Sequence, residues 1–481
     1  MKKSIALNLL LLMLFLMATP LSSQVQIGQD ILGEEAGDRS GLSNSLSSDG
    51  NRLAIGGYLN DENGTDAGHV RVYDLNNGTW SQVGQDIDGE QLGDHAGIAI
   101  SLSSDGHHLA IGATGNSNGH VQVYEWDEGA WSQVGAKIDG EIEGDNSGRS
   151  VSLSSDGSRL AIGAGGLTSR GHVQVLEWNG TNWMQMGTKI LAAWQDAQLG
   201  ASVSLSSDGS FLALGAPGNA PGYAQVYEWN GEDWIQKGNN ISSIEENQGK
   251  VGFNVTISSD GKRLAVDEPF YRINETSTGA VRIFEWDGEN WTQMGTDLQA
   301  EEGEGLFGSA LSLSSDGSRV SIGIPSNTEK STNSGLVRVF EWNEQEWIQV
   351  GEDIYGKADK DQMGASASLS SDGKRVAIGA WLNDDNGIDA GHVRVYNLEL
   401  TSSITPSAIN RLEIYPNPTN GTIKLLNASS GIVRVTDHLG QHILQTEISN
   451  DQLDLSELPN GVYFIQHSIN DQKKVNKLIK I

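Results

Sequence analysis

Four histidines stand at equivalent places in this sequence, each opening a run that alternates apolar and polar residues. They are His69, His120, His172 and His392. An imidazole can ligate a transition metal or carry a proton in catalysis. Because the residue recurs at one place of a repeated pattern, we interpret it as a structural position shared by the repeats rather than as a metal site.

Two acidic loops have the composition of a calcium site. Asp61–Asp66 reads DENGTD and Asp384–Asp389 reads DDNGID, with acid and amide oxygens at alternate positions. Ca²⁺ prefers such oxygen ligands, but neither loop has the glutamate that ends an EF-hand loop. A solvated turn rich in Asn, Asp and Gly also accounts for both loops. We favour that interpretation, and calcium binding stays open.

No residue pattern points to catalysis. The chain has no cysteine, which excludes a thiol nucleophile, and its serine-rich strands offer no G-x-S-x-G elbow. One repeat reads Val266-Asp267-Glu268-Pro269 where others read I-G-A; a site and sequence drift both account for this, and we favour drift. We therefore assign no catalytic, cofactor-binding or metal-ligating residue, expect no cofactor, and predict that the protein is not an enzyme.

Tryptophans recur in pairs around a short turn. Such rings could stack on sugars, but recurrence at one place in five repeats predicts cross-strand packing instead. Trp194 and Trp381 lie outside this pattern and are better candidates for ligand contact, although a packing role explains them equally well. The pairs are Trp126/Trp131, Trp178/Trp183, Trp229/Trp234, Trp286/Trp291 and Trp342/Trp347.

All these residues belong to a sevenfold repeat. The tetrapeptide SSDG occurs seven times at intervals of 51 to 56 residues, a period typical of propellers and solenoids. Its aspartates are Asp49, Asp105, Asp156, Asp208, Asp260, Asp316 and Asp372.

Each repeat contains four segments that alternate as strands do. In the third repeat they are Ser150–Ser154, Arg159–Ala164, His172–Trp178 and Trp183–Gly187, with Asp156-Gly157 suited to a hairpin turn. Four antiparallel strands without a helix predict the blade of a β-propeller, so the fold class is all-β.

The two ends of the array predict a closed ring. The seventh repeat ends at His392–Leu398 and lacks the W-x-Q-V-G strand of the others, whereas Val25–Ile31 copies that strand. Pairing of these segments would complete the last blade and leave no open sheet edge. We predict a seven-bladed β-propeller over residues 24–400.

The repeats resemble the FG-GAP family, which includes the propellers of integrin α-chains. Leu212–Pro217 contains the literal GAP and Leu306–Ser309 the literal FG, while most other copies keep only G-x-S and I-G-A. Integrin-type repeats carry a calcium loop between their first two strands. Here that connection is the SSDG turn with one carboxylate, so those calcium sites do not carry over.

Propeller topology divides the loops between two faces. The turns from strand one to two and from strand three to four are short and alike, and we call their side the uniform face. The loops from strand two to three and the connections between repeats differ in length, and we call their side the variable face. It includes the acidic segments Glu34–Asp38, Glu141–Asp145 and Glu301–Glu304. Because variable loops on a rigid scaffold commonly carry function, we expect this face to bind the ligand.

Charge and the N-terminus limit the partners and the location. The formal net charge is −31, which disfavours nucleic acid as a partner. Residues 1–23 have the basic start, apolar run and small residues of a secretory signal peptide. No later segment is long and apolar enough to cross a membrane, and we expect a monomer.

The C-terminal residues 411–481 follow a linker at 401–410, lack the repeat, and predict a small β-sandwich. Their spaced motifs include Tyr415, Pro416, Asn417, Pro418, Gly440, Leu458, Pro459, Asn460, Gly461 and Tyr463. These motifs resemble the type A C-terminal sorting domain of the type IX secretion system of Bacteroidota. The resemblance implies passage through the periplasm, contact with the secretion machinery, and a secreted or outer-membrane-surface location.

Together these features predict a secreted or cell-surface recognition protein of the adhesion type, which binds a protein or glycan through its variable face. A secreted hydrolase or lyase with catalytic residues in the variable loops is one alternative. A structural component of the cell surface is another. The sequence does not specify the ligand.

Overall fold

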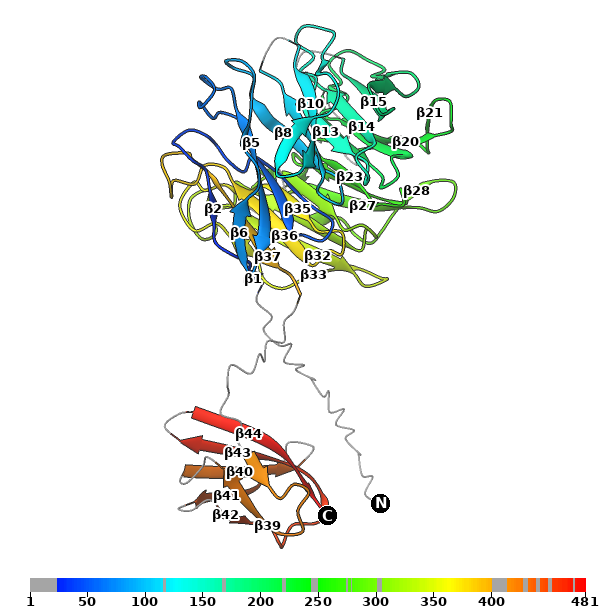
Figure 1. Cartoon of the computed structure of the whole chain (residues 1–481). Coiled ribbons are helices and arrows are strands. Elements are labelled where there is room, and N and C mark those ends of the chain that lie inside the picture. Colours follow the sequence, from blue (N-terminus) through cyan, green and yellow to red (C-terminus); the bar gives the residue numbers. More distant parts are fainter. Residues whose placement is uncertain are drawn as a thin grey trace, which may run out of the picture. The chain divides into compact units, whose positions relative to one another are not determined.

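The computed structural model describes residues 24–115, 118–166, 170–218, 222–243, 250–273, 276–277, 279–300, 305–399, 413–426, 431–437, 442–448, 452–469 and 472–481. The chain forms two units, within residues 1–400 and 401–481 (Figure 1). The expected signal peptide, the expected linker and Gly440 lie outside the described residues.

The first unit contains seven antiparallel sheets of five strands each. The innermost strands are β3 (Ser43–Leu46), β8 (Ala96–Leu102), β13 (Ser150–Leu153), β18 (Ser202–Leu205), β23 (Val255–Ile257), β30 (Ala310–Leu313) and β35 (Met363–Leu369). The second strands are β4 (Arg52–Gly57), β9 (His108–Ala113), β14 (Arg159–Ala164), β19 (Phe211–Ala216), β24 (Arg263–Glu268), β31 (Arg319–Ile324) and β36 (Arg375–Ala380). The third strands are β5 (His69–Asn76), β10 (His120–Asp127), β15 (His172–Trp178), β20 (Tyr223–Trp229), β27 (Ala280–Trp286), β32 (Leu336–Trp342) and β37 (His392–Asn397).

The outer edge of each sheet consists of two short strands, where the sequence predicts one. Both pieces pair with the third strand. A glycine at positive φ separates them: Gly135 has φ +75°, and a Cβ there would lie 2.8 Å from the Trp178 ring of the next blade. The first pieces are β6 (Thr79–Gln82), β11 (Ala130–Gln133), β16 (Trp183–Gln185), β21 (Trp234–Gln236), β28 (Trp291–Gln293), β33 (Trp347–Gln349) and β1 (Val25–Gln26). The second pieces are β7 (Ile87–Asp88), β12 (Ile138–Asp139), β17 (Ile190–Leu191), β22 (Ile241–Ser242), β29 (Leu298–Gln299), β34 (Ile354–Tyr355) and β2 (Ile31–Leu32).

The SSDG turns form the inner circle of the ring. In each turn the aspartate accepts a hydrogen bond from the first serine, as Asp156 does from Ser154 Oγ at 2.7 Å. The backbone amide of the second serine donates a hydrogen bond to the carbonyl oxygen of the equivalent serine in the next blade, over 2.7–3.0 Å. The circle runs through Ser48, Ser104, Ser155, Ser207, Ser259, Ser315, Ser371 and back to Ser48. The first unit is therefore a closed β-propeller of seven blades.

The N-terminal segment supplies the outer edge of the last blade. β1 pairs antiparallel with β37, with Val25 opposite Asn397, and β2 pairs with the same strand, with Ile31 opposite Val393. In Figure 1 blue β1 lies beside β37. An ion pair follows the same seam, because Asp30 Oδ2 lies 2.9 Å from Nη2 of the fully buried Arg394.

Blades pack closely because small residues meet at their interfaces. Gly112 of the I-G-A motif lies against Gly148 of the G-x-S motif in the next blade, and a Cβ on Gly112 would lie 2.0 Å from the Gly148 carbonyl oxygen. Valine, leucine and isoleucine side chains of neighbouring sheets fill the remaining space, as in the cluster that contains Val70, Val72, Leu109 and Ile111. This burial of apolar surface stabilises the ring.

The second unit is a β-sandwich. Its smaller sheet has the order β38 (Glu413–Tyr415), β39 (Thr422–Leu426), β42 (Gln452–Asp454). Its larger sheet has the order β41 (His442–Ile448), β40 (Gly431–Asp437), β43 (Gly461–Ile469), β44 (Gln472–Lys480). The two sheets share one apolar core, in which Ile423 and Leu425 meet Val433, Val435 and Ile465. Among the residues the model describes, no helix is long and apolar enough to span a bilayer.

Candidate functional site

The loops lie on two faces as the topology requires. On the variable face, loops between second and third strands bind the neighbouring connections: Gly93 N donates to Thr65 O at 2.9 Å, and Asn63 Nδ2 donates to Gly89 O at 2.7 Å. In blade five, two short paired strands, β25 (Arg272–Ile273) and β26 (Thr276–Ser277), add a hairpin to this face. Backbone contacts of this kind hold the variable loops at fixed positions.

Exposed apolar side chains of the propeller gather on the variable face. Leu191 at 64% exposure, Ile388 at 74% and Trp194 at 44% are examples. Other exposed apolar residues, such as Met184 on β16, lie on the first of the two outer-edge strands of their blades, whereas Leu191 ends the second, β17, where a variable-face connection begins. Within the described residues, none lies in the turns of the uniform face. The variable-face set is Leu92, Ile142, Leu191, Trp194, Phe270 and Ile388.

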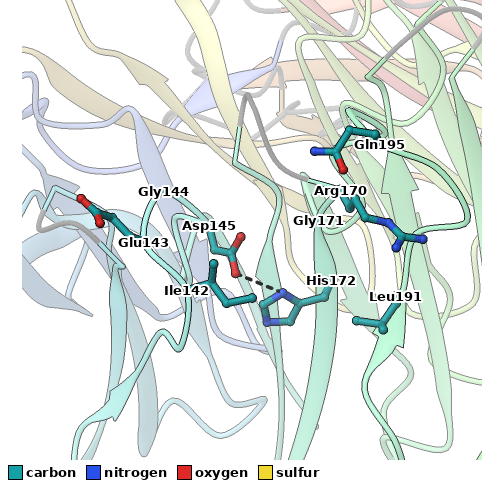
Figure 2. Close-up of a pocket in the computed structure, with 9 residues that line it drawn as sticks. All are labelled: Ile142, Glu143, Gly144, Asp145, Arg170, Gly171, His172, Leu191 and Gln195. Carbon is teal, nitrogen blue, oxygen red and sulfur yellow. Dashed lines mark ion pairs between the residues drawn. The ribbon is translucent and has the colours of Figure 1, made fainter.

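Blade three carries a pocket on this face, with a volume of about 410 Å³. Figure 2 shows the His172 imidazole between the side chains of Ile142 and Leu191, with Asp145 on the same side as Ile142. His172 Nδ1 lies 3.6 Å from Asp145 Oδ2. Arg170 borders the pocket and is held by the Ala192 carbonyl, which accepts from Nη2 at 2.7 Å. We call this the blade-three pocket.

Burial shifts the pKa values of two groups in the blade-three pocket. Burial lowers the pKa of His172, against the opposing effect of Asp145. Burial likewise raises the pKa of Asp145, although the charge of His172 and Lys189 would lower it. A neutral imidazole between two apolar side chains can accept a hydrogen bond from a ligand hydroxyl or amide. The sequence pattern identified His172 as a shared position but gave no sign of the exposed Ile142 and Leu191 beside it.

The paired tryptophans have the structural role expected of them. The two rings of each pair lie 5.3–5.5 Å apart. The second tryptophan also donates to a carbonyl of the preceding blade, as Trp234 Nε1 does to Met186 O at 3.2 Å. Trp194 is exposed and packs at a tilt against Tyr223, with ring centroids 5.0 Å apart and an interplanar angle of 58°. Trp381 is half-buried and donates to Gln362 Oε1 at 2.8 Å.

The two candidate calcium loops have the same internal hydrogen bonds. Asp61 Oδ1 accepts from Asp66 N, and Asp384 Oδ1 from Asp389 N, both at 2.8 Å. These first carboxylates therefore cap their own loops, as in a self-contained turn. The geometry agrees with the solvated-turn interpretation that we favour.

The four histidines all lie buried at the variable-face ends of their strands. His69, His172 and His392 each have Nδ1 within 3.6–3.8 Å of a carboxylate oxygen. The blades thus share the position of the histidine, but the acidic groups around it differ between blades.

The centre of the ring holds no acid or aromatic group. The channel has a volume of about 390 Å³, and its lining, all within the described residues, consists of small, hydroxyl, amide and aliphatic side chains with Arg149. Its hydroxyls bind the adjacent blade, as Ser45 Oγ does by accepting from Leu102 N at 3.0 Å. These hydrogen bonds make the channel lining part of the contacts between blades.

The deviation in blade five has a structural partner. Asp267 stands where other blades have the I-G-A glycine, is fully buried, and accepts from Asn254 Nδ2 and Asn254 N, both at 2.9 Å. Asn254 stands where blades one, three, four and seven have the serine of G-x-S, and like Ser150 in blade three it donates to the next glycine carbonyl, that of Gly308. Asp267 and Asn254 are therefore hydrogen-bonded partners, and the change at one position matches the change at the other instead of reflecting independent drift.

The C-terminal motif residues hold the last strand. Asn417 Nδ2 donates to Lys477 O at 2.7 Å and Asn417 Oδ1 accepts from Ile479 N at 2.9 Å. Tyr463 is buried and its hydroxyl donates to Pro459 O at 2.8 Å. Tyr415, Pro416 and Pro418 are exposed.

Comparison with protein families identifies this unit. Residues 413–481 match the secretion system C-terminal sorting domain family. This part of the chain is a type IX secretion sorting domain. The sorting domain engages the secretion machinery, and the protein is exported to the cell surface or to the outside.

The other comparisons do not extend to the propeller's function. Comparison with curated proteins finds no match. Among solved structures, hydrazine synthase of Kuenenia stuttgartiensis is similar over 74% of this chain and 94% of its own, at 13% identity and a TM-score of 0.49. Raptor of Chaetomium thermophilum is similar over 78% of this chain and 29% of its own, at 12% identity and a TM-score of 0.49. Neither likeness bears on what this protein binds.

Proposed function

We propose that the protein is a secreted or cell-surface recognition protein of the adhesion type, which binds a protein or glycan through the variable face. The observation that supports this is the set of exposed apolar side chains on that face, together with their absence from the described turns of the opposite face. Contiguous exposed apolar patches mark interaction sites, and Ile142 and Leu191 line the same pocket. Export to the cell surface or beyond gives such a face access to external ligands.

We also propose that the repeats are FG-GAP-like. The support is the contact between the two motif glycines of neighbouring blades, of which Gly112 and Gly148 are an example. The literal Phe307-Gly308 follows the pattern, with Phe307 fully buried. Such a scaffold presents its binding loops on one face without calcium in the SSDG turns.

The test of the binding function uses glycan arrays and pull-down with extracellular proteins, followed by titration of the best ligand. The double variant Ile142→Ser/Leu191→Ser should weaken binding about tenfold or more. The reason is that each apolar side chain that the ligand covers contributes on the order of 1–2 kcal/mol to binding. Met184→Ser is the matched control, since Met184 is similarly apolar and exposed but lies on β16 and is not one of the residues that line the blade-three pocket. The proposal would be contradicted if the double variant and Met184→Ser weakened binding equally. It would also be contradicted if only substitutions on the uniform face weakened binding.

A second candidate, a secreted hydrolase or lyase, has the His172–Asp145 pair in its favour. A buried neutral imidazole beside a carboxylate can act as a general base. Turnover screens with polysaccharides and peptides test this candidate, and activity lost in His172→Asn would support it over simple binding. Failure of both screens would favour the third alternative, a structural surface component.

A further inference from the structure

Blade one gathers three carboxylates around a buried histidine on the variable face. Glu34 lies in the connection after β2, Glu62 in the loop between β4 and β5, and Asp86 between β6 and β7, while His69 opens β5. One ligand atom of each residue lies within 4.8 Å of those of the others. We call these four residues the blade-one cluster.

Among the described residues, the imidazole of His69 has no hydrogen-bond partner. The residue is 0% exposed, and both ring nitrogens are unpaired. Nδ1 faces the cluster, 3.6 Å from Asp86 Oδ2 and 3.8 Å from Glu34 Oε2. These distances are too long for hydrogen bonds. Because an unpaired buried polar group costs free energy, an ion between these atoms would relieve that cost.

The cluster carries excess negative charge. Arg71 Nη1 lies 2.9 Å from Glu34 Oε1, which leaves the other oxygen of Glu34 facing His69. Asp88 adds a further carboxylate close to Glu62 and Asp86. A cation in the cluster would offset this repulsion, while Arg71 fixes the orientation of one ligand from outside, as second-shell partners do.

Blade seven shows what a balanced version of this site looks like. Asp30, Asp385 and His392 form a similar group. There Asp30 is paired with Arg394 at 2.9 Å and with Lys357 at 3.0 Å. Because Arg394 and Lys357 already offset the negative charge of Asp30, the argument for a bound cation applies to blade one and not to blade seven.

We propose that the blade-one cluster binds a divalent transition-metal ion such as Zn²⁺ through His69 Nδ1 and the carboxylates of Glu34, Glu62 and Asp86. One imidazole with carboxylates is a ligand set that Zn²⁺ accepts, at bond lengths of about 2.0–2.2 Å. Tetrahedral ligands at those lengths stand roughly 3.3 Å apart, so small side-chain shifts suffice. Ca²⁺, in contrast, takes oxygen ligands.

The position of one ligand links the site to the closure of the ring. Glu34 follows the ring-closing strand β2, whereas the other ligands belong to blade one. The ion would therefore join the closing segment to the first blade and stabilise the ring by binding the folded state.

The experiment titrates the untagged mature chain with ZnCl₂ by calorimetry and records thermal unfolding with and without the ion. We expect one ion per chain and a higher unfolding midpoint. Glu62→Gln, which changes an exposed ligand, should weaken binding about tenfold or more, and His69→Asn should abolish it. Glu35→Gln is the matched control, because Glu35 is an exposed neighbour of Glu34 outside the cluster.

Absence of stoichiometric Zn²⁺ binding overturns the proposal, as does binding that Glu62→Gln weakens no more than Glu35→Gln does. Binding that His69→Asn leaves unchanged, with Ca²⁺ as tight as Zn²⁺, also overturns it, because it indicates general attraction to acidic loops. If His69→Asn does not fold, the comparison of Glu62→Gln with Glu35→Gln decides.

Discussion

The amide of Ser371 donates a hydrogen bond to the carbonyl of Ser48 over 3.0 Å. This contact joins the SSDG turn of the last blade to that of the first and completes the inner circle. The outer edge of the same blade is completed by β1 and β2 on β37. The ring is thus closed both at its inner circle and at the outer edge of the last blade. Only the outer closure depends on the N-terminal strands β1 and β2, which pair with the last strand of the propeller.

The outer closure should depend on Asp30. Asp30→Ala leaves the fully buried Arg394 without this carboxylate, and loss of one partner of a buried ion pair costs about 3–5 kcal/mol. We expect residues 24–32 to detach first, because no covalent turn links them to β37. Limited proteolysis and hydrogen exchange of this segment in the full chain measure the effect.

Asp353→Ala is the control for that experiment. Asp353 binds Arg338 at 2.8 Å in blade six, at the equivalent place, but its strand follows β32 through a hairpin turn. The variant should lose stability without releasing the N-terminal segment. Equal protection of residues 24–32 in both variants would show that Asp30 does not hold the seam.

Much of the ring could be predicted from sequence because the same turn and strand patterns recur in every repeat. SSDG specifies a turn by its aspartate, and Val25–Ile31 copies a strand that the seventh repeat lacks, which predicts the pairing seen with β37. The split outer strand was not predicted. Its cause is contact between blades, since Gly135 breaks the strand where the Trp178 ring approaches.

The indole N–H of the second tryptophan in each pair should contribute to blade association. Trp234→Phe keeps an aromatic ring but removes the donor to Met186 O, which should lower the free energy of unfolding by about 1 kcal/mol. Trp229→Phe at the same hairpin is the control, because the ring pair is kept and the bond to the preceding blade is untouched. Denaturant unfolding of both variants makes the comparison, and an equal loss would assign the effect to ring packing.

The candidate sites were less accessible to sequence reasoning than the fold. Ile142 and Leu191 are ordinary apolar residues in the sequence, and their exposure beside His172 follows from how three loops of one face converge. His69 and His392 occupy one repeat position, yet the charges around them come from Arg71, Arg394 and Lys357 on different elements. Such differences depend on packing between segments and not on local pattern.

Asn417 should stabilise the last strand of the sorting domain. Asn417→Ala removes both side-chain hydrogen bonds to the β44 backbone, at Lys477 and Ile479, and should cost about 1–3 kcal/mol locally. We expect faster hydrogen exchange in residues 472–481 of the full chain and less protein at the cell surface. Asn460→Ala, at an exposed turn residue, should change the exchange of β44 little. Unchanged exchange in Asn417→Ala would contradict this role.

The buried Asp267 should make the propeller less stable at higher pH. Burial raises its pKa to about 7, although hydrogen bonds from Asn254 act to lower it. The folded state therefore holds a proton that the unfolded chain releases near its ordinary pKa of 3.8. Since the folded state binds more protons between these values, stability falls as pH rises from about 4 to about 7 and then levels off. Each pKa unit corresponds to about 1.4 kcal/mol.

The double variant Asp267→Gly/Asn254→Ser tests this relationship, because it restores the glycine and serine found at these positions in blades one, three, four and seven. Unfolding midpoints at pH 5 and pH 8 should differ less in the double variant than in the native protein. Other titrating groups are common to both proteins and cancel in the comparison. Asn254→Ser alone should be less stable than the double variant, because it leaves the buried Asp267 with fewer donors. An unchanged difference between the two pH values would mean that Asp267 keeps the same charge in the folded and unfolded states.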